Sequence, residues 1–170
     1  MKTRSLFAIV VLLAACLLVS NSAVAAQPGA SGSIKCALDM KYDEHEPETY
    51  YWLGTVTGPD CSVAGTIRFD AVFDEYTYPG ETMHFVEEFT IEPYAGGVIR
   101  GKNWGVWNMS TFKFRAHGWV REASDEWAHL VGAQYHEIGV TSDPALGLPI
   151  TAPDGKAKLA PSKRPPDTLP

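Results

Sequence analysis

This chain of 170 residues has no helical periodicity, no basic segment and no catalytic signature motif. No stretch of a dozen residues repeats its apolar side chains at helical spacing, which argues against a helical bundle. Acidic residues outnumber basic ones by 20 to 14, and the formal net charge is -6. Without a run of lysine or arginine, this balance argues against nucleic acid or an anionic membrane surface as the main partner.

Motifs for common chemistries are also missing. There is no Gly-x-Ser-x-Gly elbow for a nucleophile and no glycine-rich loop that opens a helix around a phosphate. The histidines lack the HxH or HExxH spacing of metal ligands, and His84, His117 and His136 fall on different predicted strands. We therefore predict neither a metal site nor a cofactor.

Only one long apolar run is present, and it lies at the N-terminus. Lys2 and Arg4 precede an apolar segment over residues 6–19, and small residues at 23–26 offer a cleavage site before Gln27. This is the pattern of a signal peptide over residues 1–26, which predicts export to the periplasm or the extracellular space. After its removal, no other segment is apolar enough to predict a transmembrane span.

A second interpretation of this segment stays open. Residues 13–16, Leu-Ala-Ala-Cys, resemble the lipobox of bacterial lipoproteins, which would place a lipid anchor on Cys16. The apolar residues that follow Cys16 are unlike the small polar residues usual after that site. Ordinary signal cleavage is therefore the preferred interpretation.

Cysteine is scarce, with three residues in the whole chain. Loss of the signal peptide leaves Cys36 and Cys61, and an even count in an exported chain predicts one disulfide. Such a bond would close a loop of about 25 residues and stabilise the fold by roughly 3 kcal/mol in the chain-entropy picture. Two buried free thiols are the alternative.

Alternating apolar and polar residues predict an all-β fold. In residues 111–120, Phe112, Phe114 and Ala116 fall on one face while Lys113 and Arg115 fall on the other, which is typical of a half-buried strand. Similar segments recur with glycine and proline between them, as expected for an antiparallel sandwich or barrel. They cover residues 33–40, 50–57, 62–73, 82–92, 97–107 and 127–141.

Glycines inside these strands favour a closed or nearly closed barrel of about eight strands over a sandwich, because they let a sheet bend. We predict a flexible lead-in over residues 27–32 and a single barrel domain over residues 33–142. Residues 143–170 hold more than half of the chain's 12 prolines, so we expect a disordered, proline-rich tail there.

Glu87 is the most informative polar residue. Strict alternation with Phe85 and Phe89 points its carboxyl inward, where it would serve as an acid/base or a ligand anchor. The preferred interpretation is a bulge at Glu87 and Glu88 that turns both carboxyls to solvent. If the protein is an enzyme, Glu87 would be the acid/base, with His84 or Tyr135 assisting.

Aromatic residues are dense for a domain of this size and serve either as core or as the wall of a binding site. We predict that the ligand-binding residues are Phe85, Glu87, Phe89, Trp104, Trp107 and Phe114.

Residues 111–119, Thr-Phe-Lys-Phe-Arg-Ala-His-Gly-Trp, resemble the glycine-marked strand of dirigent and allene oxide cyclase-like barrels. That family has a phenylalanine, a small residue and a glycine at similar spacing. The resemblance implies an eight-stranded antiparallel barrel with a cavity for small, largely apolar molecules. Asn108, Met109 and Ser110 stand where that family usually has glycines, so no catalytic residue is carried over.

Three functions follow as hypotheses. The first is an exported barrel that binds a small apolar or aromatic molecule without transforming it. The second is a structural or envelope-interaction barrel with a filled core. The third is an isomerase or cyclase that acts on an apolar substrate inside the barrel. A fold alone does not choose among them.

Overall fold

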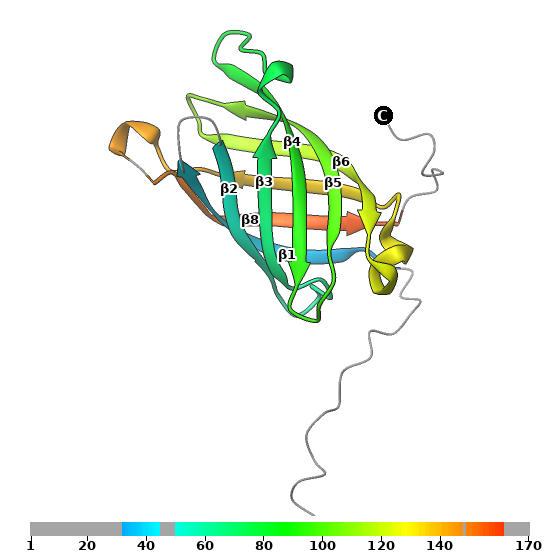
Figure 1. Ribbon diagram of the computed structural model, residues 1–170. Helices are drawn as coiled ribbons and strands as arrows, with labels where there is room; N and C mark the ends of the chain where they lie inside the picture. The colour runs from blue at the N-terminus through cyan, green and yellow to red at the C-terminus, as the bar shows by residue number, and fades with distance from the viewer. Residues whose placement is uncertain (1–31, 45–49, 148, 162–170) are drawn as a thin grey trace, which may run out of the picture. The chain divides into compact units, whose positions relative to one another are not determined.

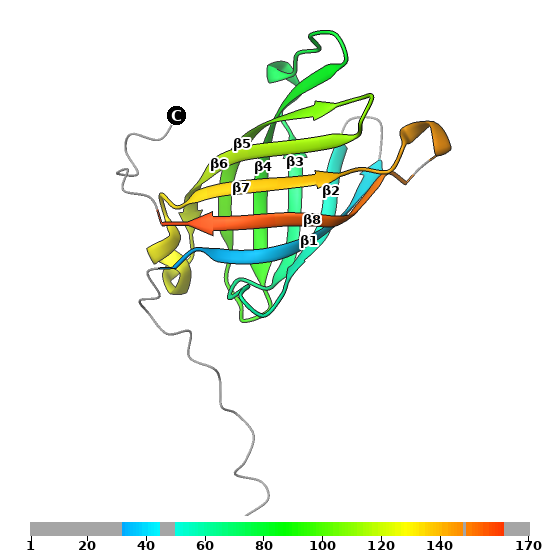
Figure 2. The same cartoon turned by 180° about the vertical axis from the view of Figure 1, so that it is seen from behind.

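A computed structural model describes residues 32–44, 50–147 and 149–161. These residues form a closed antiparallel barrel in which each strand pairs with its neighbours in sequence and β8 returns to β1. Figures 1 and 2 show the strands wrapped around one interior. The strands are β1 (Ile34–Glu44), β2 (Tyr50–Thr57), β3 (Gly65–Ala71), β4 (Thr82–Pro93), β5 (Ile99–Asn108), β6 (Lys113–Ala123), β7 (Gln134–Val140) and β8 (Thr151–Ala160). The predicted all-β barrel fold is confirmed.

The segment predicted to be a disordered tail contains a strand, so that boundary is wrong. β8 pairs with both β1 and β7, and it closes the barrel. Most of its inward positions are small, such as Gly155 and Ala157, with Leu159 as the large apolar residue, so the composition predicted too little apolar surface for a core. The register against β1 shifts between Leu38 and Met40, which accommodates Pro153 within the strand.

The predicted signal peptide lies outside the described residues, as does nearly all of the lead-in. The segment at 127–141, predicted to be one strand, begins as the short 3-10 helix η2 (Asp125–Leu130) and becomes β7 only at Gln134. No helix among the described residues has the length and apolar character needed to cross a bilayer.

One end of the barrel is closed by η2 and by the disulfide. Trp127 and Leu130 of η2 are buried, and the Trp127 indole donates to the carbonyl of Gly96 at 2.9 Å. At the same end, the predicted disulfide joins Cys36 of β1 to Cys61 in the β2–β3 turn, with Cα atoms 4.8 Å apart. At this closed end, the disulfide thus links the first strand of the barrel to the turn of its second hairpin.

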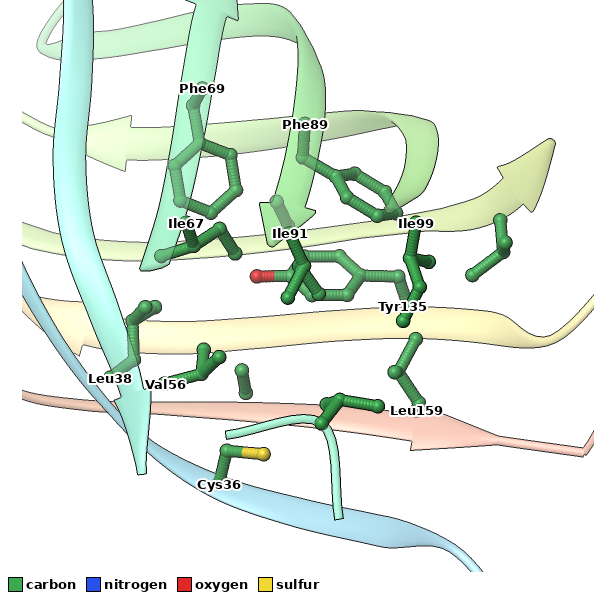
Figure 3. Close-up of a cluster of buried hydrophobic side chains, with 14 of the residues drawn as sticks. Cys36, Leu38, Val56, Ile67, Phe69, Phe89, Ile91, Ile99, Tyr135 and Leu159 are labelled. Atoms are coloured by element: carbon green, nitrogen blue, oxygen red, sulfur yellow. The ribbon is translucent and has the colours of Figure 1, made fainter. Parts of the chain in front are cut away.

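The core fills the half of the barrel next to this closed end. Tyr135, Phe69 and Phe89 are its largest fully buried side chains. Figure 3 shows the Tyr135 ring among Phe89, Ile91 and Ile99, and the Tyr135 and Phe89 rings stack with centroids 4.4 Å apart. This packed layer forms a floor across the barrel interior.

Inward phenylalanines lie against glycines on the neighbouring strand. Phe85 is paired with Gly105 and Phe89 with Gly101 across β4 and β5, while Phe114 is paired with Gly139 across β6 and β7. A Cβ atom on any of these glycines would collide with the ring opposite. Because the glycine leaves that space free, each ring lies against the wall of the barrel instead of extending across it.

Gly105→Ala tests this packing. The added methyl group displaces the Phe85 ring toward the barrel axis, and we expect the free energy of unfolding to fall by about 1–3 kcal/mol, as overpacking does. Urea denaturation measures the change. Gly32→Ala is the control, because a Cβ there meets open space and should change stability by less than about 0.5 kcal/mol. Equal stability of the two variants would contradict the packing argument.

Candidate functional site: an apolar cavity with a carboxyl pair

A cavity of about 250 Å³ occupies the barrel half opposite η2. Its walls come from the open ends of the strands and from the β3–β4 loop, and most of the side chains are aromatic or aliphatic. The lining residues are Met40, Tyr42, Trp52, Phe69, Ala71, Phe73, Tyr76, Tyr78, Met83, Phe85, Glu87, Trp107, Phe114, Glu137, Thr141 and Ile150. The cavity is therefore an apolar space with two carboxyl groups.

Aromatic side chains surround the mouth of this cavity. Tyr42 and Trp52 meet edge to face, with ring centroids 5.3 Å apart. In the β3–β4 loop, Tyr76 lies between Phe73 and Phe85, with centroids 5.2 and 6.5 Å away. Phe73 is 47% exposed, so a large apolar surface meets solvent at the entrance. Such an entrance suits a molecule that arrives with apolar surface of its own.

Glu87 faces the interior, and the preferred interpretation of a bulge at this position is wrong. The β4–β5 register runs without a shift from Thr82 to Ile91, so strict alternation is kept. Glu87 is 6% exposed, whereas its neighbour Glu88 is exposed on the outer face. The regular pairing of β4 with both β3 and β5 holds the Glu87 carboxyl inside.

A second carboxyl, Glu137 of β7, is 3% exposed and shares the cavity with Glu87. The Tyr135 hydroxyl donates to Glu137 Oε2 at 2.8 Å, and Asn103 Nδ2 donates to Glu137 Oε1 at 3.2 Å. The other side-chain atom of this amide, Asn103 Oδ1, is buried without a hydrogen-bond partner. Glu137 thus has two donors that favour its ionised form, while a buried acceptor next to it lacks a donor.

The two carboxyls differ in how readily they ionise. Burial is the largest cause that raises the pKa of Glu87 well above its ordinary value, followed by the charge of Glu137, while the Asn103 amide opposes the rise. Burial raises the pKa of Glu137 to about 7, against the opposing effects of Tyr135 and Asn103. At neutral pH the pair therefore keeps at least one proton, held mainly by Glu87, and Glu137 is the carboxyl that ionises first.

No positively charged side chain neutralises this pair from within the cavity. Among the described residues that line the cavity there is no lysine, arginine or histidine. The described part of the chain also holds no group of three or more His, Cys, Asp or Glu side chains arranged for a metal ion. An ionised carboxyl here lacks the cation that usually accompanies a buried charge.

The predicted ligand-binding residues separate into three groups. Phe85, Glu87, Trp107 and Phe114 line the cavity. Phe89 is fully buried beneath it as part of the floor. Trp104 lies on the outer face, where its ring centroid is 5.7 Å from that of Trp119, and it is not among the residues that line the cavity.

The acid/base partners considered for an enzyme also separate. His84 is exposed on the outer face of β4, and its backbone pairs with Thr77 of the β3–β4 loop. It is therefore not positioned to assist Glu87. Tyr135 is buried and contacts the pair through Glu137.

Sequence reasoning missed Asn103 and the partnership of Glu137 with Glu87. Trp104 and Trp107 of β5 were both predicted to bind ligand, although they lie on opposite faces of the strand, so the inward face was not identified. The glycines opposite Phe85 and Phe89 hold the correct signal, because Gly101 and Gly105 share a face with Asn103. On β7, alternation from buried Tyr135 also places Glu137 inside.

Fold and site together define an eight-stranded antiparallel barrel, closed at one end, with an apolar cavity and a carboxyl pair in the other half. No protein-family model, curated protein or solved structure matches this chain. The resemblance to dirigent and allene oxide cyclase-like barrels therefore extends to the architecture, without a family match to confirm it.

Stability should depend on pH through the carboxyl pair. A carboxyl whose pKa is raised by folding stabilises most below its unfolded pKa, and this stabilisation is lost as pH rises through the folded value. For Glu137 that window runs from about 4.5 to about 7, and Glu87 extends it upward. We expect the free energy of unfolding to fall by about 2 kcal/mol or more between pH 5 and pH 8, as measured by urea denaturation.

The double variant Glu87→Gln with Glu137→Gln should remove most of this pH dependence. Glu88→Gln with Glu92→Gln is the matched control, since both of these residues are exposed and Glu88 lies on the same strand next to Glu87. The control should keep the slope of the wild type. The same slope in the interior double variant would show that the pair is not the cause.

Proposed function

We propose that this protein is an exported barrel that binds a small apolar or aromatic molecule in its cavity without transforming it. The observation that carries the proposal is the 250 Å³ cavity, which is lined mainly by aromatic and aliphatic side chains and has an aromatic entrance. Ligand sites in proteins are typically concave and apolar with few polar groups, as this one is. A filled core, the second hypothesis, lacks such a space.

The size of the cavity limits the ligand. A cavity of about 150 Å³ holds benzene, and drug-sized ligands occupy about 300–1,000 Å³. The space here suits one substituted aromatic ring or a fused pair of rings. The barrel architecture implied by the resemblance to dirigent and allene oxide cyclase-like proteins supports a cavity protein of this kind.

Export is supported by two features. The N-terminal sequence has the pattern of a cleaved signal peptide, with a lipid anchor on Cys16 as the alternative. The disulfide between Cys36 and Cys61 is typical of proteins that fold in an oxidising compartment. We therefore place the protein in the periplasm or the extracellular space.

Binding is tested with 3-propylindole, a neutral aromatic molecule that suits the cavity. We expect isothermal titration calorimetry to show a single site. Ala71→Phe should weaken binding at least tenfold, because Ala71 lines the cavity and the added ring fills it. Ala37→Phe places the same ring on the exposed face of β1 and serves as the control. Absence of binding, or equal affinity in both variants, would refute the proposal.

The carboxyl pair also favours a second candidate, an isomerase or cyclase that moves protons on an apolar substrate. Two carboxyls with unequal pKa values are typical of acid/base sites. In such a reaction Glu137 would remove a proton and Glu87 would supply one, leaving the total number of protons on the substrate unchanged. Under the binding proposal, neither carboxyl transfers a proton to or from the ligand.

Conversion of 3-cyclohexen-1-one to its conjugated isomer separates these two functions. We expect no acceleration above buffer, as followed by ultraviolet absorbance, because the binding proposal assigns the pair no proton transfer. Acceleration that Glu87→Gln abolishes, with 3-propylindole binding retained, would establish the enzyme instead. Glu88→Gln, one residue away on the outer face, is the control.

A further inference from the structure

We propose that the molecule bound in the cavity is an apolar amine, whose ammonium group lies against Glu87 and Glu137 while its apolar body fills the space toward Trp107. This inference deepens the proposed function and rests on it. It names the chemical class of the ligand at the same site.

The first argument is charge. Both carboxyls line the cavity and are at least 94% buried, with relative exposures of 6% and 3%. No cationic side chain among the described lining residues balances them. A buried carboxylate is costly unless a positive group accompanies it, and the cavity leaves that position to a ligand.

The second argument is the surplus of hydrogen-bond acceptors. Glu137 receives two donors, from Tyr135 and from Asn103, whereas Asn103 Oδ1 is fully buried with no donor. An ammonium group has three N–H donors and no acceptor. In the cavity it can donate to the oxygens of Glu87 and Glu137, which line the space, and it supplies the missing positive charge, while a hydroxyl supplies one donor and no charge.

The third argument is the shape of the rest of the cavity. Beyond the carboxyls, Phe85, Phe114 and Trp107 provide apolar walls, and Trp52 with Tyr42 stands at the entrance. A ligand with charge at both ends would leave one of its charges against these rings. The cavity thus fits a single ammonium group on an otherwise apolar molecule.

A metal ion is a weaker occupant than an amine. The described residues contain no group of three or more metal-ligating side chains, and the cavity offers two carboxyls among apolar walls. Calcium takes six to eight oxygen ligands, and zinc is held by three or four. Neither requirement is met by this pair.

The groups that face the pair set its pH dependence. Tyr135 of β7 and Asn103 of β5 contact Glu137, and the phenol of Tyr76 from the β3–β4 loop lines the same cavity. From β3 the facing residue is Ala71, and β6 contributes Phe114. From β1 and β2 the lining side chains are Met40, Tyr42 and Trp52. Among the described residues that face the cavity, the side chains that titrate near neutral pH are therefore Glu87 and Glu137.

Tryptamine and 3-propylindole make a matched pair of probes, because a methyl group replaces the ammonium group of the amine. At pH 8, we expect isothermal titration calorimetry to show tryptamine binding at least tenfold more tightly, as a charge-assisted hydrogen bond would give. Indole-3-propionate, the anionic relative, should bind more weakly than either. The preference for tryptamine should shrink several-fold at pH 5.5, where protons neutralise the pair.

Glu137→Gln should bring the ratio of tryptamine to 3-propylindole affinity close to one, while Glu88→Gln on the outer face should leave the ratio unchanged. Equal binding of the two probes by the wild type overturns the amine inference and leaves the proposed function standing. Failure of both probes to bind overturns both. If Glu137→Gln does not fold, the wild-type pH series decides: a ratio that is constant from pH 5.5 to pH 8 overturns the inference.

Discussion

Phenylalanine packed on glycine across neighbouring strands is the constraint on which the interior of this barrel depends. An eight-stranded barrel is just wide enough for its side chains to fill it, so an empty space has to be created. Phe85 and Phe114 lie against Gly105 and Gly139, which have no Cβ, and they leave the axis free. The cavity is thus a product of paired residue choices on adjacent strands.

The carboxyl pair occupies the boundary between this cavity and the packed floor. Below it, Tyr135 is stacked on Phe89, and its hydroxyl is fixed on Glu137. Glu137 accepts hydrogen bonds from Tyr135 and Asn103, whereas Glu87 is placed by strand alternation and has Asn103 as its hydrogen-bonding neighbour. Unequal support of two similar groups explains why they part with their protons at different pH.

Strand rhythm and glycine content were sufficient to predict a closed barrel, and the even number of cysteines left after the signal peptide predicted the disulfide between Cys36 and Cys61. The prediction failed at β8, because small residues such as Gly155 and Ala157 take inward positions there and the proline-rich segment has a weak apolar signature, even though Leu159 is buried in the core. The inward position of Glu87 followed from alternation, but local repulsion between adjacent carboxyls favoured a bulge instead. The regular pairing of β4 with β3 and β5, which the sequence does not display, keeps the Glu87 carboxyl on the inward face.

Asn103 shows the limit of reading one strand at a time. In β5 large apolar side chains lie on both faces, with Trp104 and Val106 outside and Ile99 and Trp107 inside, so hydrophobicity alone does not identify the inward face. The pairing with β4 corrects this, since Phe85 and Phe89 need a glycine opposite. The inward position of a polar residue that lies between two glycines can therefore be recognised only when the neighbouring strands have been aligned.

The pairing of β8 with β1 has a consequence for how the chain comes to be folded. During synthesis from the N-terminus β1 appears before the other strands, and its partner β8 is the last of the eight strands to appear. Until then both open edges expose unpaired backbone groups, which invite association with other chains. Newly synthesised molecules therefore have an open barrel until β8 has paired with β1. Chaperones that bind unfolded chains can act during this period.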